Sequence, residues 1–264
     1  MFLTSIQYKP TNQTQYPHSL PIFSQLSLLN FESPVTILVG ENGTGKSTLL
    51  NGLACVTNRN LIGANDIDNN HDMRAGQDLA KTFKATYKTK TNRGFFLRAE
   101  DFISFSRRVR TMIEEAEAEL KRIEVDYKDR SDYVKGLASQ PHNRTLYDLK
   151  QRYGDGLDVR SHGEKFLDFF RSQLHPRGLY ILDEPEAPLS PIKQMAFIRM
   201  LLEGVEEGSQ FIISTHSPIL MATPNAQIYS LEDDGLMERE FEELEHVQLT
   251  KQFLEAPERF LRHL

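Results

Sequence analysis

The sequence is poor in three features: it has one cysteine, no tryptophan and no apolar run approaching the roughly 18 residues of a membrane-spanning helix. We therefore expect no direct insertion into a membrane. Because Cys55 is alone, no disulfide can form within the chain, which favours a reducing compartment and predicts a cytoplasmic location. The first residues carry neither a basic cluster nor a long apolar run, so no signal peptide is expected.

Net positive charge is also absent, because 37 acidic residues outnumber 31 basic ones. A net charge of −6 argues against a general electrostatic attraction to nucleic acid or anionic membranes, although it leaves room for a local basic patch. What is present is an ordinary globular composition over 264 residues, enough for one large α/β domain that carries an insert.

One glycine-rich segment dominates the interpretation. The aliphatic run Val35–Val39 predicts a buried strand, and residues 48–53 open a helix. The eight residues between them, GENGTGKS, match the spacing G-x-x-x-x-G-K-[ST] without a mismatch. Glycines let this loop turn tightly and bring backbone N–H groups to an anion, and the dipole of the following helix points at the same place.

We therefore predict that this loop binds a nucleoside triphosphate rather than being a glycine-rich turn without a ligand. Lys46 would contact the β- and γ-phosphates, and the Ser47 hydroxyl would ligate Mg²⁺. The predicted nucleotide-binding residues are Gly40, Glu41, Asn42, Gly43, Thr44, Gly45, Lys46, Ser47 and Thr48.

Polar side chains follow two further apolar strands. The run Gly178–Leu182 ends in Asp183 and Glu184, and Phe211–Ser214 is followed by His216. Ligands of open α/β sheets gather at the carboxyl ends of the strands, so Asp183 is expected to hold Mg²⁺ and Glu184 to orient the attacking water. His216 would donate a hydrogen bond to the γ-phosphate or the water. The alternatives are a capping turn and a structural histidine.

The middle of the chain predicts a helical insert. Residues 111–125 form an amphipathic helix, further helical pieces run to about Tyr153, and we expect a break near Pro141. The insert, residues 101–174, is predicted to be a compact helical lobe because it is too short for a long coiled-coil arm. The polar stretch from Asn58 to about Asp78 is predicted to be an irregular connection.

The segment Lys81–Arg110 is locally basic, with aromatic residues between its lysines and arginines. Such a stripe could follow a phosphate backbone while its rings stack on bases. It could equally be a half-buried strand and helix whose aromatic side chains belong to the core.

Four motifs in order carry a family resemblance: residues 40–47, Ser161 to Glu164 (SHGE), residues 182–185 (LDEP) and residues 214–216 (STH). This set resembles that of the ABC-type ATPase superfamily, near its stand-alone SMC-, RecF- and OLD-type members. The whole chain, including its ending around residues 248–261, resembles a group of small bacterial AAA-type ATPases. The resemblance implies an α/β P-loop NTPase fold with a mixed sheet and a helical insert, in one domain spanning residues 1–264.

The resemblance also implies a composite site in a head-to-tail homodimer. Ser161 and Gly163 look like the signature motif, which contacts the γ-phosphate held by the opposite subunit; read alone, SHGE is a capping box. Ser190 stands where the family's D-loop carries an acid, and Glu100 or Arg98 where its Q-loop carries glutamine. The predicted catalytic residues are Glu184, His216 and Lys46, with ATP and Mg²⁺ as cofactors.

Three functions are compatible with these motifs. The first is an ATP-hydrolysing clamp or switch in DNA maintenance or antiphage defence, working with an effector such as a nuclease and with DNA as a candidate partner. The second is the ATPase subunit of a membrane transporter. The third is a nucleotide-gated scaffold that hydrolyses little.

Overall fold

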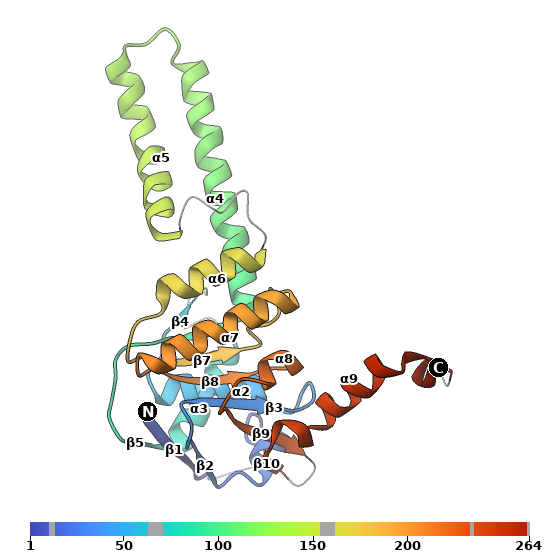
Figure 1. The fold of residues 1–264 in the computed structure, drawn as a ribbon. Coiled ribbons are helices and arrows are strands. Elements are labelled where there is room, and N and C mark those ends of the chain that lie inside the picture. The colour runs from blue at the N-terminus through green and yellow to red at the C-terminus, as the bar shows by residue number, and fades with distance from the viewer. Residues whose placement is uncertain (11–13, 63–70, 154–161, 233–234, 263–264) are drawn as a thin grey trace.

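The computed structural model describes residues 1–264 except 11–13, 63–70, 154–161, 233–234 and 263–264 (Figure 1). Its largest element is a seven-stranded sheet of order β10-β9-β3-β8-β7-β6-β4. All neighbouring strands are parallel except β10, which is antiparallel to β9. The strands are β3 (Val35–Val39), β4 (Leu61–Ile62), β6 (Phe96–Arg98), β7 (Leu179–Asp183), β8 (Gln210–Ser214), β9 (Gln227–Glu232) and β10 (Gly235–Arg239).

Every residue of β3, β7 and β8 is buried, as expected for parallel strands covered on both faces. Alternate side chains point to opposite faces. Ile181 and Ile212 therefore belong to one hydrophobic core, and their neighbours Leu182 and Ile213 to another.

A second, antiparallel sheet of order β2-β1-β5 covers the first core. Its first two strands, β1 and β2, lie near the N-terminus and pair with each other. The strands are β1 (Leu3–Tyr8), β2 (Leu28–Asn30) and β5 (Phe83–Tyr87).

Helices fill the two cores. Helices α2 and α3 pack against each other in the first core, and α6 and α7 lie on the other face of the sheet (Figure 1). The helices of the body are α1 (Pro21–Ser24), α2 (Lys46–Val56), α3 (His71–Thr82), α6 (His162–Gln173), α7 (Pro191–Glu206) and α8 (Pro218–Met221).

The prediction of an irregular connection over residues 58–78 is wrong for its second half, which forms most of α3. Buried Met73 and Leu79 lie two turns apart in this helix and face the core. Gly76 lies between them, and a Cβ there would lie 2.9 Å from both the Cβ and the backbone oxygen of Asn51 in α2. Close packing against α2 stabilises this segment as a helix. The polar composition of the stretch gives no sign of this packing.

The prediction of a compact helical lobe for the insert is also wrong. Instead of a compact lobe, α4 (Ala99–Asp126) and α5 (Asp132–Tyr153) form an antiparallel hairpin that stands out from the body (Figure 1). Helix α4 has 28 residues, which at 1.5 Å per residue is about 42 Å. Pro141 lies inside α5 and does not end it. Because α5 is largely exposed, the carbonyl group that loses its N–H donor to proline is open to water.

The chain leaves the body through the 3-10 helix η3 (Phe241–Glu243), α9 (Glu245–Glu255) and α10 (Pro257–Leu261). Helices α9 and α10 project from the body on the side opposite β5 (Figure 1). Within the described part of the chain, no helix is both long and apolar enough to cross a bilayer.

Candidate nucleotide-binding site

The glycine-rich loop joins β3 to α2, as predicted. Gly43 and Gly45 have left-handed φ angles of 80° and 104°, which residues with a Cβ rarely adopt. At Gly45 a Cβ would also lie 2.9 Å from Ile22 Cγ2 of α1. The loop therefore depends on glycine for both its backbone conformation and its packing.

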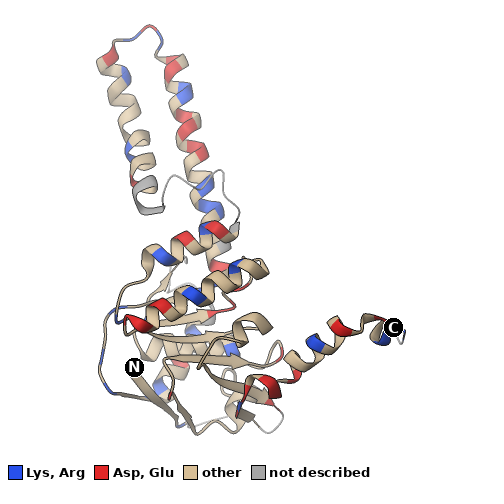
Figure 2. Ribbon diagram, in the orientation of Figure 1, with Lys and Arg blue, Asp and Glu red and all other residues tan. Residues whose placement is uncertain are grey.

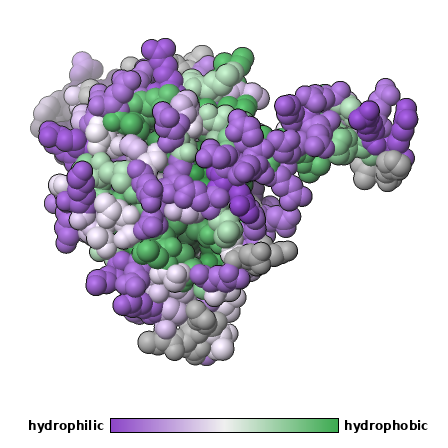
Figure 3. Space-filling model, turned by 60° about the horizontal axis from the view of Figure 1, so that its bottom comes forward, coloured by the Kyte–Doolittle hydropathy of each residue, from purple (hydrophilic) through white to green (hydrophobic). Residues whose placement is uncertain are grey.

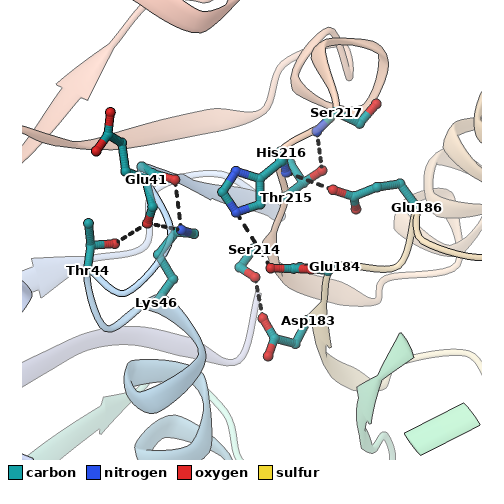
Figure 4. A network of polar contacts seen from close by, with 11 residues as sticks. Glu41, Thr44, Lys46, Asp183, Glu184, Glu186, Ser214, Thr215, His216 and Ser217 are labelled. Atoms are coloured by element: carbon teal, nitrogen blue, oxygen red, sulfur yellow. Dashed lines mark hydrogen bonds and ion pairs between the residues drawn. The ribbon is translucent and has the colours of Figure 1, made fainter. Parts of the chain in front are cut away.

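Lys46 begins α2 and is buried, with only 5% of its surface exposed. Its Nζ donates hydrogen bonds of 2.7 Å to the carbonyl oxygens of Gly40 and Glu41, so the ammonium group lies inside the curve of the loop (Figure 4). Burial lowers the pKa of Lys46, while the nearby carboxylates, Glu184 foremost, oppose this effect. A phosphate in the loop would offer this cation a stronger partner than the two carbonyl groups.

Asp183 ends β7 beside the loop and is buried. The Ser214 hydroxyl donates a hydrogen bond to its carboxylate (Figure 4). Ser47 is hydrogen-bonded to the carboxylate as well. Burial raises the pKa of Asp183, and both hydroxyl groups work against this rise. Ser47 and Asp183 thus form an adjacent pair of hydroxyl and carboxylate oxygens, the donor type that Mg²⁺ prefers, and they fit the predicted metal site.

Glu184 and His216 face each other at the ends of neighbouring strands. Glu184 has a left-handed φ of 49°, and its backbone N–H donates to the Ser214 carbonyl at 3.0 Å. Its Oε1 lies 3.5 Å from His216 Nε2 (Figure 4). Burial lowers the pKa of His216, and Lys46 lowers it further, against the opposing effect of Glu184. The imidazole is therefore neutral near pH 7.

Sequence reasoning missed Glu186, which lies in the turn after β7. Its Oε1 accepts a 2.7 Å hydrogen bond from the backbone N–H of His216 (Figure 4). Burial raises the pKa of Glu186. Its place directly after the Asp-Glu-Pro turn is the one signal that could have drawn attention to it. Glu186 joins the turn that bears Glu184 to the loop that bears His216.

The start of α2, the start of α4 and the end of β7 border a cavity of about 280 Å³. Arg98 and Glu100, predicted at the Q-loop position, line this cavity together with the residues of the phosphate loop and the end of β7. Arg98 is buried, and its Nε lies 2.5 Å from Asp101 Oδ2 at the start of α4. The lining residues are Ser47, Thr48, Asn51, Arg98, Ala99, Glu100, Asp183, Glu184 and Ala187.

The predicted signature motif is only partly covered. Ser161 lies outside the described residues, whereas Gly163 is buried in the first turn of α6. A Cβ on Gly163 would lie 2.8 Å from the Pro188 carbonyl oxygen and from Lys193 Cδ. This glycine thus allows α6 to pack closely on the turn between β7 and α7. Ser190 precedes α7, and its side chain makes no capping hydrogen bond.

The aromatic stripe belongs to the core. Phe83, Phe95, Phe96 and Phe102 are each at most 7% exposed and pack in the hydrophobic cores. They cannot stack on nucleic-acid bases without leaving the interior. For these four aromatic residues the interpretation as a half-buried strand and helix is therefore right; Tyr87 is half-buried, and the side chain of Phe105 lies outside the described residues.

Comparison with known proteins agrees with this fold. Residues 63–222, more than half of the chain, match the family described as "AAA domain, putative AbiEii toxin, Type IV TA system". The "Cobalt import ATP-binding protein CbiO" of Salmonella typhimurium (strain LT2) is 26% identical over 247 residues, 89% of this chain and 83% of that protein. Its counterpart in Salmonella typhi is 27% identical over 222 residues, 82% and 74% of the two chains.

Two solved structures show lower similarity. The Smc head domain of Pyrococcus furiosus, with an extended coiled coil, has 13% identity and a TM-score of 0.46, over 97% of this chain and 100% of that one. The cbiO1 protein of Clostridium perfringens, part of an ABC transporter complex, has 16% identity and a TM-score of 0.46, over 100% and 99%. The predicted α/β fold with a mixed sheet is confirmed, and the chain belongs to the AAA-domain family that matches residues 63–222.

Proposed function

We propose that this chain binds ATP with Mg²⁺ in the loop of residues 40–48 and hydrolyses it. The observation that carries the proposal is the convergence of four predicted residues from separate parts of the sequence. Ser47, Asp183 and Glu184 line one cavity, and His216 Nε2 lies 3.5 Å from the Glu184 carboxylate. The ATP-binding proteins among its sequence relatives support the same nucleotide.

Each residue has a role that follows from its surroundings. Lys46 and the loop N–H groups would bind the β- and γ-phosphates, and Ser47 with Asp183 would hold Mg²⁺, which supplies charge neutralisation when bound. Glu184 would accept a hydrogen bond from the attacking water and orient it towards the γ-phosphate. The neutral His216 would donate from Nε2 to the γ-phosphate or to the water, and Glu186 positions the His216 backbone.

The second part of the proposal is a head-to-tail homodimer with two composite sites. Gly163 in the first turn of α6 and Ser161, which lies outside the described residues, would contact the γ-phosphate held by the other chain. The first turn of a helix presents free N–H groups and a positive dipole end, which suits this task. ATP would then stabilise the dimer by mass action, and hydrolysis would release it.

The biological setting that we favour is a cytoplasmic ATP-gated clamp or switch in antiphage defence or DNA maintenance, acting with an effector such as a nuclease. The family description, which names a toxin of a toxin–antitoxin system, supports defence. A transporter ATPase is the second candidate, because the CbiO relatives are import ATP-binding proteins. Co-purification of a membrane protein would favour transport, whereas salt-dependent DNA binding that changes with ATP would favour the clamp.

A Glu184→Gln variant tests the proposed function. It should bind Mg-ATP as the wild type does, release phosphate at least about 100-fold more slowly, and accumulate as a dimer in sedimentation experiments. Glu203→Gln is the matched control, since Glu203 is an exposed carboxylate on α7, paired with Arg199. Undiminished phosphate release by Glu184→Gln, or a strictly monomeric variant with Mg-ATP, would contradict the proposal.

A further inference from the structure

The position of the His216 ring depends on the backbone that carries it. His216 Nε2 makes no hydrogen bond with the described residues and lies 3.5 Å from Glu184 Oε1. The two side chains come from separate segments, since Glu184 follows β7 and His216 lies in the loop after β8. Their separation therefore depends on the hydrogen bonds that tie the loop after β8 to the turn after β7.

Gln194, at the end of the first turn of α7, bridges these two segments. Its Nε2 donates a 3.1 Å hydrogen bond to the carbonyl oxygen of Leu189, in the turn after β7. Its Oε1 accepts a hydrogen bond from the hydroxyl group of Ser217, the residue that follows His216. Both polar atoms of this side chain are thus used, one on each segment.

The partners of Gln194 allow one orientation of its amide group. A carbonyl oxygen can only accept, so the amide nitrogen faces Leu189 and the amide oxygen faces Ser217. The Ser217 Oγ caps α8 by accepting from the backbone N–H groups of Ile219 and Leu220. The single proton of the Ser217 hydroxyl is therefore left for Gln194, and the bridge has a donor and an acceptor at each contact.

The His216 backbone is consequently held on both sides. Its own N–H donates to Glu186 Oε1 at 2.7 Å (Figure 4). The next residue, Ser217, is buried and held by Gln194. Gln194 is half-buried and is not among the residues that line the nucleotide cavity. Any effect that it has on hydrolysis is therefore expected to pass through the His216 loop.

We propose that Gln194 is a positioning residue for hydrolysis. By bridging the turn after β7 and the loop after β8, it keeps the His216 imidazole beside the Glu184 carboxylate. This inference rests on the proposed function, which gives His216 its role at the γ-phosphate or the attacking water. A displacement of about 1 Å at a reacting group can cost about 100-fold in rate. A loosened loop should therefore slow turnover and leave nucleotide binding by residues 40–48 intact.

Gln194→Met tests the role in turnover, because methionine is unbranched and favours a helix but offers neither hydrogen bond. The kcat for phosphate release should fall at least about fivefold, while the Kd of Mg-ATP should stay within about twofold of the wild type. Gln252→Met is the matched control and should change neither value, since Gln252 is exposed on α9, which projects from the body (Figure 3). A folded Gln194→Met chain with the wild-type kcat would overturn the inference.

A second measurement, nuclear magnetic resonance of the chain with isotope-labelled histidine, needs no nucleotide. The ring signal of His216 is the one that His216→Ala removes. In Gln194→Met this signal should shift or broaden, because the loop is then held on one side only, and Gln252→Met should leave it unchanged. An unchanged His216 signal in Gln194→Met would overturn the inference. If the wild-type chain released no phosphate, the proposed function would fail, while this signal would still decide whether Gln194 positions His216.

Discussion

The nucleotide-binding body and the hairpin α4–α5 are held together in different ways. In the body, every residue of the three central strands is buried. In the hairpin, a small cluster built on Val109, Ile113 and Leu149 joins the two helices, and charged residues follow one another along both (Figure 2). Packing therefore fixes the body as one cooperative unit, whereas the hairpin depends mainly on helix propensity and a few contacts.

The largest expected effect tests this difference in stability. Phe166 is fully buried and packs edge to face on Phe102, with ring centroids 5.0 Å apart. Phe166→Ala should lower the free energy of unfolding by about 3–5 kcal/mol, because it leaves a cavity in the core. Ile113→Ala makes a comparable truncation in the hairpin and should leave the main unfolding transition almost unchanged.

Thermal unfolding and hydrogen exchange measure both variants. For Ile113→Ala we expect faster amide exchange confined to α4 and α5. Equal losses of stability in the two variants would mean that body and hairpin unfold as one unit, contrary to the comparison.

The next effect concerns ligand binding. Lys46→Ala should weaken ATP binding at least about 100-fold, roughly 2.7 kcal/mol, because it removes the buried cation of the phosphate loop. Lys81→Ala removes an exposed lysine, 74% accessible and paired with Asp78, and should leave the affinity unchanged. Titration calorimetry with Mg-ATP gives both values, and wild-type affinity in Lys46→Ala would exclude the loop as the nucleotide site.

The same two regions explain what could be predicted from the sequence. The loop at residues 40–47 and the acids after β7 were found because their chemistry requires particular residues at fixed spacing. The hairpin was predicted wrongly as a compact lobe because amphipathic periodicity in α4 predicts a helix. It does not show whether the next helix packs on α4 alone or on the body. Helix α3 was missed because most of its residues are polar. Its buried apolar residues Met73 and Leu79 are covered only by tertiary packing against α2.

Glu184 offers a smaller effect, in which stability and activity change in opposite directions. Its φ of 49° is strained for any residue with a Cβ, so Glu184→Gly should raise the free energy of unfolding by about 0.5–1 kcal/mol. Glu184→Gln keeps the Cβ and should show no such gain, although both variants lose turnover. Denaturant unfolding separates them, and a gain in Glu184→Gln would assign the effect to charge instead of backbone strain.

The smallest effect is a pH dependence at Glu186. Burial raises the pKa of this carboxyl in the folded protein above its ordinary value of 4.5, so the folded state holds the proton more tightly than the unfolded state does. The contribution of Glu186 to stability is therefore most favourable at low pH and is lost as the pH rises from about 4.5 through the raised pKa.

Glu186→Gln removes this titration and keeps an oxygen that can accept the His216 N–H. The variant should match the wild type near pH 4.5 and exceed its melting temperature by about 1–2 °C at neutral pH. Glu206→Gln, an exposed carboxylate on α7, should show no such divergence. If instead Glu186→Gln lost stability most strongly at neutral pH, the charged carboxylate would be stabilising the His216 loop, and burial would not dominate at this position.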